Sequence, residues 1–237
     1  MANPFTVLAA LLLAFGLSFM GYAIGDGLRH IKPSDRAVSV RGLAEREVMA
    51  DTARLIISFS HSGDTSSAII PQMQETQKKI LAFLDQNGLK KDEAEYSPWS
   101  TGQASSAEER AKDKSLPRLT TNGDIKITTH DVQAAQKVFE QINDLQAQTN
   151  GGVSGADITY QFTGIAAIRA EMIAAATKDA RNAALQFAAD SNSQVGAIRS
   201  ASQGAFSVNT PGQDNDDPRS LRKSVRVVTT VDYELRD

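Results

Sequence analysis

Apolar residues form one long, uninterrupted block at the start of the chain. Residues 2–25 contain no charged side chain, and residues 5–24 are almost all apolar. A helix made of this block is about 30 Å long, which matches the hydrocarbon thickness of a bilayer. We therefore interpret residues 1–25 as an N-terminal signal-anchor that crosses a membrane as one transmembrane helix, and residues 26–36 as a polar tether.

Two other interpretations of this block stay open. A cleaved secretory signal needs a small-x-small site, for which Gly21-Tyr22-Ala23 is arguable, but residues 1–4 lack the basic residues that usually precede such a signal. A buried helix of a soluble protein would normally be shorter. With either signal, we expect the following domain to be translocated, and an uncleaved anchor would leave Met1 in the cytoplasm.

After the tether, apolar and polar residues alternate, which is typical of strands with one buried face. Residues 38–40 and 52–60 follow this pattern, and residues 42–47 are expected to be the connection or a bulge between the two strands. The spacing then becomes helical from Thr65 and stops at Gly88. The pattern predicts a strand pair followed by an amphipathic helix.

The middle of the chain switches again between the two patterns. Residues 94–99 look extended and residues 125–127 alternate as a strand, whereas residues 100–117 show no apolar period and are expected to form a long mobile loop. Asp131 is placed to cap a second helix, which Asn150-Gly151-Gly152 closes. The predicted buried face of this helix consists of Ala135, Val138, Phe139, Ile142 and Leu145.

The remaining pattern predicts a strand at residues 158–162, a long helix at 165–190 and two strands at 196–208 and 223–235. Helices inserted between strand pairs favour an α+β fold, with antiparallel sheet and helices packed on one side, over a doubly wound parallel sheet. We expect residues 37–237 to form this domain. The inner face of the long helix is predicted to contain Ile165, Met172, Ile173, Ala176, Ala180, Ala183, Ala184 and Phe187.

Composition narrows the chemistry that this domain can perform. The chain has no cysteine, so it has no disulfide, no thiolate metal ligand and no thiol nucleophile. Its 25 basic and 28 acidic residues are mixed along the chain and give a net charge of −3. Because no basic stripe is present, we expect no binding of nucleic acid.

Three segments carry a resemblance to a known family. They are Arg36–Asp51 (RAVSVRGLAEREVMAD), the stretch from Met172 to Gly204, and Lys223–Leu235 (KSVRVVTTVDYEL). In this order and spacing they resemble the SIMPL-domain family, bacterial envelope proteins that include periplasmic immunogenic and oxidative-stress-defence members. The resemblance implies an exported α+β domain without an established enzymatic activity. Residues 100–119 match nothing in the family.

The three histidines do not form a recognisable metal motif. His30, His61 and His130 are far apart in the sequence, and a zinc site needs three or four convergent ligands. The interpretation we favour is that they are polar residues at the ends of elements. Gly152-Val153-Ser154-Gly155 lacks the spacing of a nucleophile elbow and follows a helix rather than a strand, so we interpret it as a flexible turn.

Two further clusters have a functional and a structural interpretation. The acidic run Gln213–Pro218 offers oxygen ligands for Ca²⁺ but lacks the glycine and glutamate of an EF-hand loop, so a solvated loop is favoured. Residues 45–47 (Glu-Arg-Glu) could contact a partner or subunit, or form a salt-bridged surface turn, and the latter is favoured. Residues 202–204 (Ser-Gln-Gly) indicate a bulge or a close approach of two backbones. A ligand contact at these residues is the second interpretation.

These patterns predict no catalytic, cofactor-binding or metal-ligating residue, and we expect a protein that is not an enzyme. The main hypothesis is an envelope protein anchored in the bacterial inner membrane, with its domain in the periplasm, that acts through protein contacts as an oligomer. The SIMPL resemblance implies a role in envelope or oxidative-stress defence. The alternative is a soluble periplasmic module, released by signal cleavage, in which residues 100–117 and Trp99 close over a small molecule or cell-wall fragment. A hydrolase would need groups that only the fold could bring together.

Overall fold

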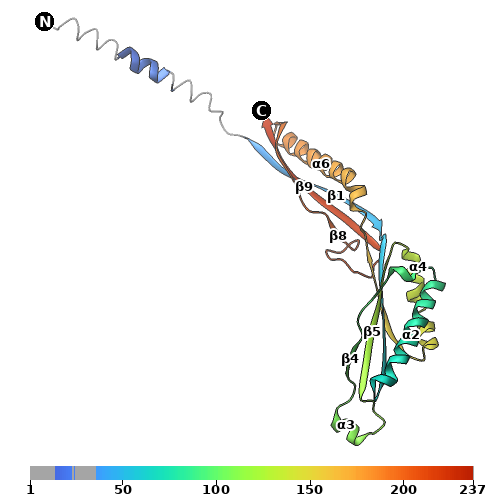
Figure 1. The fold of residues 1–237 in the computed structure, drawn as a ribbon. Coiled ribbons are helices and arrows are strands. Elements are labelled where there is room, and N and C mark those ends of the chain that lie inside the picture. Colours follow the sequence, from blue (N-terminus) through green and yellow to red (C-terminus); the bar gives the residue numbers. More distant parts are fainter. Residues whose placement is uncertain (1–13, 23, 25–35, 237) are drawn as a thin grey trace, which may run out of the picture. The chain divides into compact units, whose positions relative to one another are not determined.

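The computed structural model describes residues 14–22, 24 and 36–236 (Figure 1). Residues 14–22 are helical, whereas the rest of the predicted anchor apart from residue 24, and the predicted tether up to residue 35, lie outside the described residues. Within the described part, no helix combines the length and the apolar character needed to cross a membrane. The anchor therefore stays a prediction from the sequence.

The fold is α+β with two antiparallel sheets, as the sequence predicts. The described strands are β1 (Ala37–Met49), β2 (Thr52–Gly63), β3 (Ala94–Tyr96), β4 (Ser100–Gln103), β5 (Leu119–Thr129), β6 (Val153–Gln161), β7 (Gln194–Gln203), β8 (Ser207–Asn209) and β9 (Arg222–Arg236). The helices are α2 (Ser66–Gln86), the 3-10 turn η1 (Lys91–Glu93), α3 (Ala107–Lys112), α4 (Val132–Glu140), α5 (Ile142–Gln148) and α6 (Ile165–Asp190).

Contacts divide the chain into two compact units. The small unit includes the described residues 36–42, 180–202 and 230–236. The large unit consists of residues 43–179 and 203–229. One sheet has the strand order β1-β9-β7, with β8 also paired to β9. The other has the order β3-β5-β2-β6, with β4 also paired to β5.

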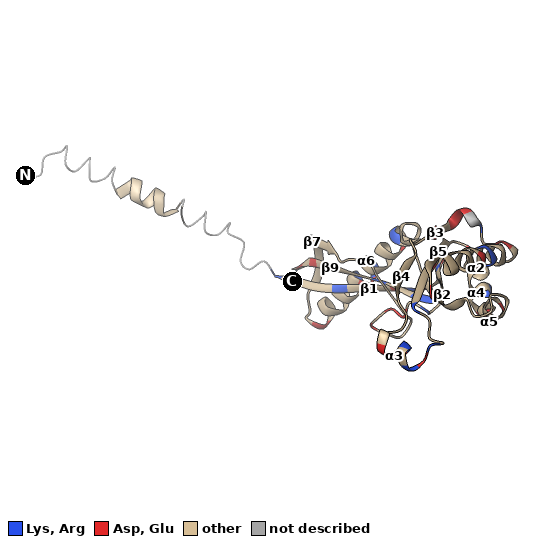
Figure 2. Cartoon of the chain, turned by 60° about the horizontal axis from the view of Figure 1, so that its bottom comes forward, with Lys and Arg blue, Asp and Glu red and all other residues tan. Residues whose placement is uncertain are grey.

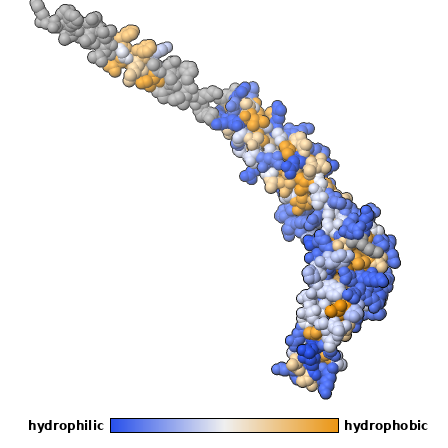
Figure 3. Space-filling model, viewed as in Figure 1, coloured by the Kyte–Doolittle hydropathy of each residue, from blue (hydrophilic) through white to orange (hydrophobic). Residues whose placement is uncertain are grey.

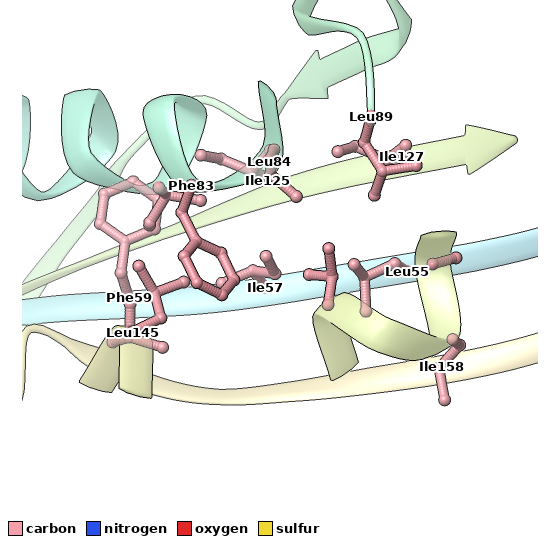
Figure 4. Close-up of a cluster of buried hydrophobic side chains, with 14 of the residues drawn as sticks. Leu55, Ile57, Phe59, Phe83, Leu84, Leu89, Ile125, Ile127, Leu145 and Ile158 are labelled. Atoms are coloured by element: carbon pink, nitrogen blue, oxygen red, sulfur yellow. The ribbon is translucent and has the colours of Figure 1, made fainter. Parts of the chain in front are cut away.

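The core of the large unit lies between its sheet and the helices α2, α4 and α5, which cover one face (Figure 1). Strand β2 is paired along its length with β5 on one side and β6 on the other, so that Leu55 stands between Ile127 and Ile158. Alternate β2 residues are fully buried, as period-2 patterning requires. Figure 4 shows the aliphatic and aromatic side chains that meet there.

The sheet of the small unit is covered on one face by residues 180–190 of α6, a helix whose buried residues are mostly alanine. Its core consists of Val38, Ala180, Ala184, Val231 and Tyr233. Along α6 the fully buried positions are Met172, Ala176, Ala180, Ala184 and Ala188, a strict spacing of four. Such a row is inclined to the helix axis, as expected of a ridge that packs closely against a neighbouring element.

The structure corrects several predicted details. Residues 42–47 are not a connection, because β1 runs unbroken from Ala37 to Met49. The predicted second helix is two helices, since α4 ends at Glu140 and α5 begins at Ile142. Within α6, Ala183 is exposed and Phe187 is 54% exposed, so neither belongs to the buried face.

Residues 100–117, expected to form a loop, contain two short elements. Strand β4 pairs with residues 119–122, the N-terminal part of β5. Helix α3 begins with a capping box, in which the side chains of Ser106 and Glu109 each accept a hydrogen bond from the other residue's backbone amide. None of the residues of α3 is buried, and the red and blue segments of its ribbon in Figure 2 mark acidic and basic residues close together on it. A short polar helix of this kind leaves no apolar period in the sequence, which is why the pattern indicated a loop.

Candidate functional site

A polar cavity of about 280 Å³ lies in the large unit, at the end of β2. It collects residues from three separate parts of the chain, because α2 and the turn after α5 both meet β2 there. The lining residues are His61, Gln72, Glu75, Thr76, Lys79, Thr149 and Asn150. Two of the predicted features, His61 and the Asn150-Gly151-Gly152 turn, are therefore neighbours in space although they are distant in sequence.

Gly152 packs tightly against two of the lining residues, His61 and Thr76. The His61 Nε2 and Thr76 Oγ1 atoms are 2.7 Å apart and share a hydrogen bond. A Cβ added to Gly152 would lie 2.7 Å from each of these atoms, closer than side chains tolerate. The Ser60 amide donates to the Gly152 carbonyl at 2.8 Å. The sequence predicts a flexible turn at residues 152–155. In the structure, β6 begins at Val153, and a glycine is needed at 152 because His61 and Thr76 leave no room for a Cβ atom.

Charge in this cavity is balanced. Burial lowers the pKa of His61, and the nearby carboxylate of Glu75 opposes that shift only in part, so the imidazole is neutral at pH 7. The Lys79 ammonium lies 3.0 Å from Glu75 and also donates to the Gln148 carbonyl at 3.2 Å. Such a site suits a small molecule that has both hydrogen-bond donors and acceptors.

A second hollow, of about 670 Å³, lies beside His130 and Asp51. His130 Nδ1 is 3.2 Å from the Thr52 hydroxyl oxygen and 3.0 Å from the Asp51 carbonyl oxygen. The Thr52 hydroxyl also lies 2.9 Å from the Asp51 carboxylate, to which it can donate. A carbonyl oxygen only accepts, so in its bond to Asp51 the Nδ1 atom of His130 is a donor and is not available as a base for the buried Thr52 hydroxyl.

The Asp51 carboxylate instead holds the start of α6. It accepts bonds from the Thr163 amide and hydroxyl, both at 2.9 Å, and from the Gly164 amide at 2.8 Å. Burial by itself would raise the pKa of Asp51, but these bonds together with the one from Thr52 lower it. The arrangement is a helix cap supplied by a distant part of the chain.

The acidic run at residues 213–218 already holds a cation of the chain itself. The ammonium of Lys223, whose side chain is fully buried, donates to the Asp216 carboxylate at 2.7 Å and to the Asp217 carbonyl at 2.9 Å. Within the described residues, no group of three or more histidine and carboxylate side chains is placed to hold a metal ion. The loop is thus anchored by an internal ion pair, a feature that sequence reasoning did not find.

The chain is similar to one family of known proteins. Residues 38–233 match the family model described as "SIMPL: Protein of unknown function (DUF541)". The chain belongs to the SIMPL family. No curated protein matches it. Among solved structures, a hydrolase from Listeria innocua aligns with 86% of this chain and 96% of its own, at 9% identity and a TM-score of 0.24, which is too weak to carry an argument.

Two segments that suggested the SIMPL resemblance have structural contacts. Glu45 accepts a bond from the Ser224 hydroxyl of β9, and Arg46 pairs with Glu171 of α6 at 2.6 Å. Arg46 is thus salt-bridged, but residues 45–47 lie in strand β1 and not in the surface turn that was favoured. Gly204 donates its amide to the Val228 carbonyl at 2.8 Å, and a Cβ there would lie 3.0 Å from that oxygen, which confirms the predicted close backbone approach.

Trp99 does not line either cavity. Its ring meets the edge of Phe59 in a T-shaped contact, with 6.5 Å between ring centroids, and it packs beside Gly123. The side chain is therefore part of the margin of the large core. His30 lies outside the described residues, and Ser154 is exposed on β6.

Proposed function

We propose that this SIMPL protein is a non-enzymatic envelope protein, anchored in the bacterial inner membrane by residues 1–25 and acting in the periplasm through protein contacts as an oligomer. The observation that carries the proposal is the open construction of the small unit. Among the described residues, its sheet has one helical layer, and the outer edges of β1 and β7 have no strand partner. Leu185, Phe187 and Ile198 are each about half exposed. Figure 3 shows hydrophobic residues at the surface in the region of α6 and β9.

Position along the chain supports an assembly close to the membrane. Strand β1 begins at Ala37, which follows the predicted anchor by only the tether of residues 26–36. Eleven residues reach at most about 40 Å when fully extended. An anchored chain would thus keep its small unit near a shared surface, where tethering raises the effective concentration of copies. A role in envelope or oxidative-stress defence is part of the proposal, because the family resemblance implies it.

The test is to fractionate cells that express the full chain, wash the membranes with carbonate, and measure the mass of the intact protein and of its complexes in detergent. We expect a full-length, carbonate-resistant species larger than one chain. A monomer at high concentration would overturn the assembly, and a soluble chain that begins near Ile24 would overturn the anchor.

A second candidate, binding of a small molecule, is favoured by the cavity around His61. Its balanced charge and its volume of about 280 Å³ suit a small polar or zwitterionic molecule, such as a cell-wall amino acid or a fragment of similar size. Thermal unfolding with and without a panel of free amino acids tests this function. A stabilisation that His61→Gln abolishes and Gln72→Ala weakens would support it, and no stabilisation by any member would overturn it for that class.

A further inference from the structure

Strand β7 is an unusually open edge. Within the described residues its one strand neighbour is β9, and every residue from Ala197 to Gln203 is exposed. It contains no proline and no lysine, and Arg199 is its only charged residue. Ile198, in its middle, is 54% exposed. An edge of this length carries a row of backbone groups that can accept another strand.

Two other edges in the described chain, those of β1 and β6, are better protected than the edge of β7. Strand β1 carries four charged residues, Arg41, Glu45, Arg46 and Glu47. On β6 the Tyr160 amide already donates to the Pro218 carbonyl, from the segment that leads into β9. Charged side chains and covering segments are the usual ways in which proteins block unwanted strand addition. Strand β7 carries a single charged residue, Arg199, and within the described residues no further strand pairs with its outer edge, so this edge is open to a partner.

We propose that β7 pairs antiparallel with β7 of a second copy, about a two-fold axis through Ile198, and so joins two small-unit sheets into one. Residues that face each other across an antiparallel pair point to the same side of the sheet. About a two-fold axis perpendicular to the sheet, a residue can then stand opposite itself, but not opposite its immediate neighbour. Each possible register therefore has one residue on the axis.

Charge and apolar contact select the register. An axis at Arg199 would put two like charges opposite each other, which is destabilising. An axis at Ile198 places this exposed apolar side chain against its own copy and sets Arg199 opposite Ala197. Ile198 is also the midpoint of residues 194–202, the part of β7 that belongs to the small unit, so this register pairs that whole segment.

The small-unit sheet is braced behind this edge. Asp232 of β9 accepts hydrogen bonds from Ser200 of β7 and Ser39 of β1, and these bonds lower the pKa of its carboxyl. The three strands are thus tied together by polar side chains on one face. A strand held in this way needs little ordering before it adds a partner, which favours pairing.

This inference rests on the proposed oligomer, and cysteine cross-linking in the full chain tests it separately. Because the natural chain has no cysteine, Ile198→Cys introduces a single thiol at the proposed axis, where facing Cβ atoms lie close enough for a disulfide. We expect oxidation in detergent to give a cross-linked dimer. Leu185→Cys, on the exposed surface of α6, is the matched control and should cross-link several-fold less.

Three more variants make the outcome decisive. Ala197→Cys mixed with Arg199→Cys should cross-link better than either alone, because these positions face each other in the proposed register. Ile198→Lys should lower the oligomer mass while circular dichroism stays unchanged. If Ile198→Cys does not cross-link and Ile198→Lys stays oligomeric, the β7 pairing is wrong and assembly uses another surface. If the unmodified chain is monomeric, both the pairing and the proposed function are wrong.

Discussion

The two units solve the problem of burying a sheet face in opposite ways. In the large unit, three helices cover the sheet with long side chains, and the buried cluster includes Leu55, Ile57, Phe59, Ile80 and Leu84 among twenty residues (Figure 4). The cluster of the small unit has five buried residues, two of them alanine. Free energy from apolar burial scales with area, so the large unit has much more of it.

This difference teaches where stability and association are expected to reside. A core of large side chains supports its own unit, and the loss of one such side chain leaves a cavity. A thin, alanine-lined layer depends on close approach of helix and sheet, and it leaves strands of the sheet at the surface. We therefore expect the large unit to dominate unfolding measurements and the small unit to dominate self-association.

The largest effect should come from Phe59→Ala. The Phe59 ring is 1% exposed and packs against Trp99, so its loss removes a large buried side chain and an aromatic contact. We expect a loss of about 3–5 kcal/mol in the free energy of unfolding, measured by urea denaturation. Ile70→Ala, at a position that is 43% exposed on α2, is the control and should change it little. Equal effects would contradict the idea of one dominant core.

The small unit should respond most to a larger side chain rather than a smaller one. Ala184 is fully buried in the alanine row of α6, whereas its neighbour Ala183 is exposed. We expect Ala184→Leu to cost about 1–3 kcal/mol, because the added atoms must push helix and sheet apart. Ala183→Leu should be nearly neutral in the same urea titration. If both variants were tolerated, close packing of α6 would not be what holds this layer.

The positions of most elements could be predicted from the sequence, because their patterns are strong and local. The bounds of α6 are those predicted, and β9 was found from its alternation. Strand β1 was cut short in the prediction because residues 45–47 looked like a charged turn. Their charges are accommodated by contacts with Ser224 and Glu171, which come from distant parts of the chain and leave no local signal.

A buried ion pair in the large unit should have an effect of intermediate size. Asp216→Asn leaves the buried Lys223 ammonium without its carboxylate, although the Asp217 carbonyl still accepts from it. We expect a loss of ~1–2 kcal/mol. Lys223→Met removes the charge together with its need for a partner and should cost less. Asp214→Asn in the same loop is the control, and the unfolding free energy is again the measurement. A larger loss for Lys223→Met than for Asp216→Asn would contradict this account.

The candidate site was predicted much less well than the fold. His61 and Gly152 are ninety-one positions apart, and only the pairing of β2 with β6 brings them together. The pairing of Lys223 with Asp216 of the acidic loop could not be predicted from the sequence either, because a lysine in an alternating strand is normally expected at the surface. Long-range register decided the contact between His61 and Gly152, and the folding back of the loop decided the contact between Lys223 and Asp216. A single sequence encodes neither in a readable pattern.

The smallest expected effect on the free energy of unfolding comes from Asp51, whose carboxylate caps α6, and it depends on pH. The bonds to Asp51 hold its pKa below the value of about 3.9 expected in the unfolded chain. Its stabilising contribution is thus fully present above that unfolded value and is lost as the pH falls through the lower folded-state pKa. We expect Asp51→Asn to cost about 0.5–2 kcal/mol near pH 6, and the gap to the unmodified chain to narrow below about pH 4. Urea denaturation midpoints measured between about pH 3 and pH 6 test this prediction, with Asp144→Asn as an exposed control. A stability difference between Asp51→Asn and the unmodified chain that stays constant with pH would show that the carboxylate charge does not stabilise the start of α6.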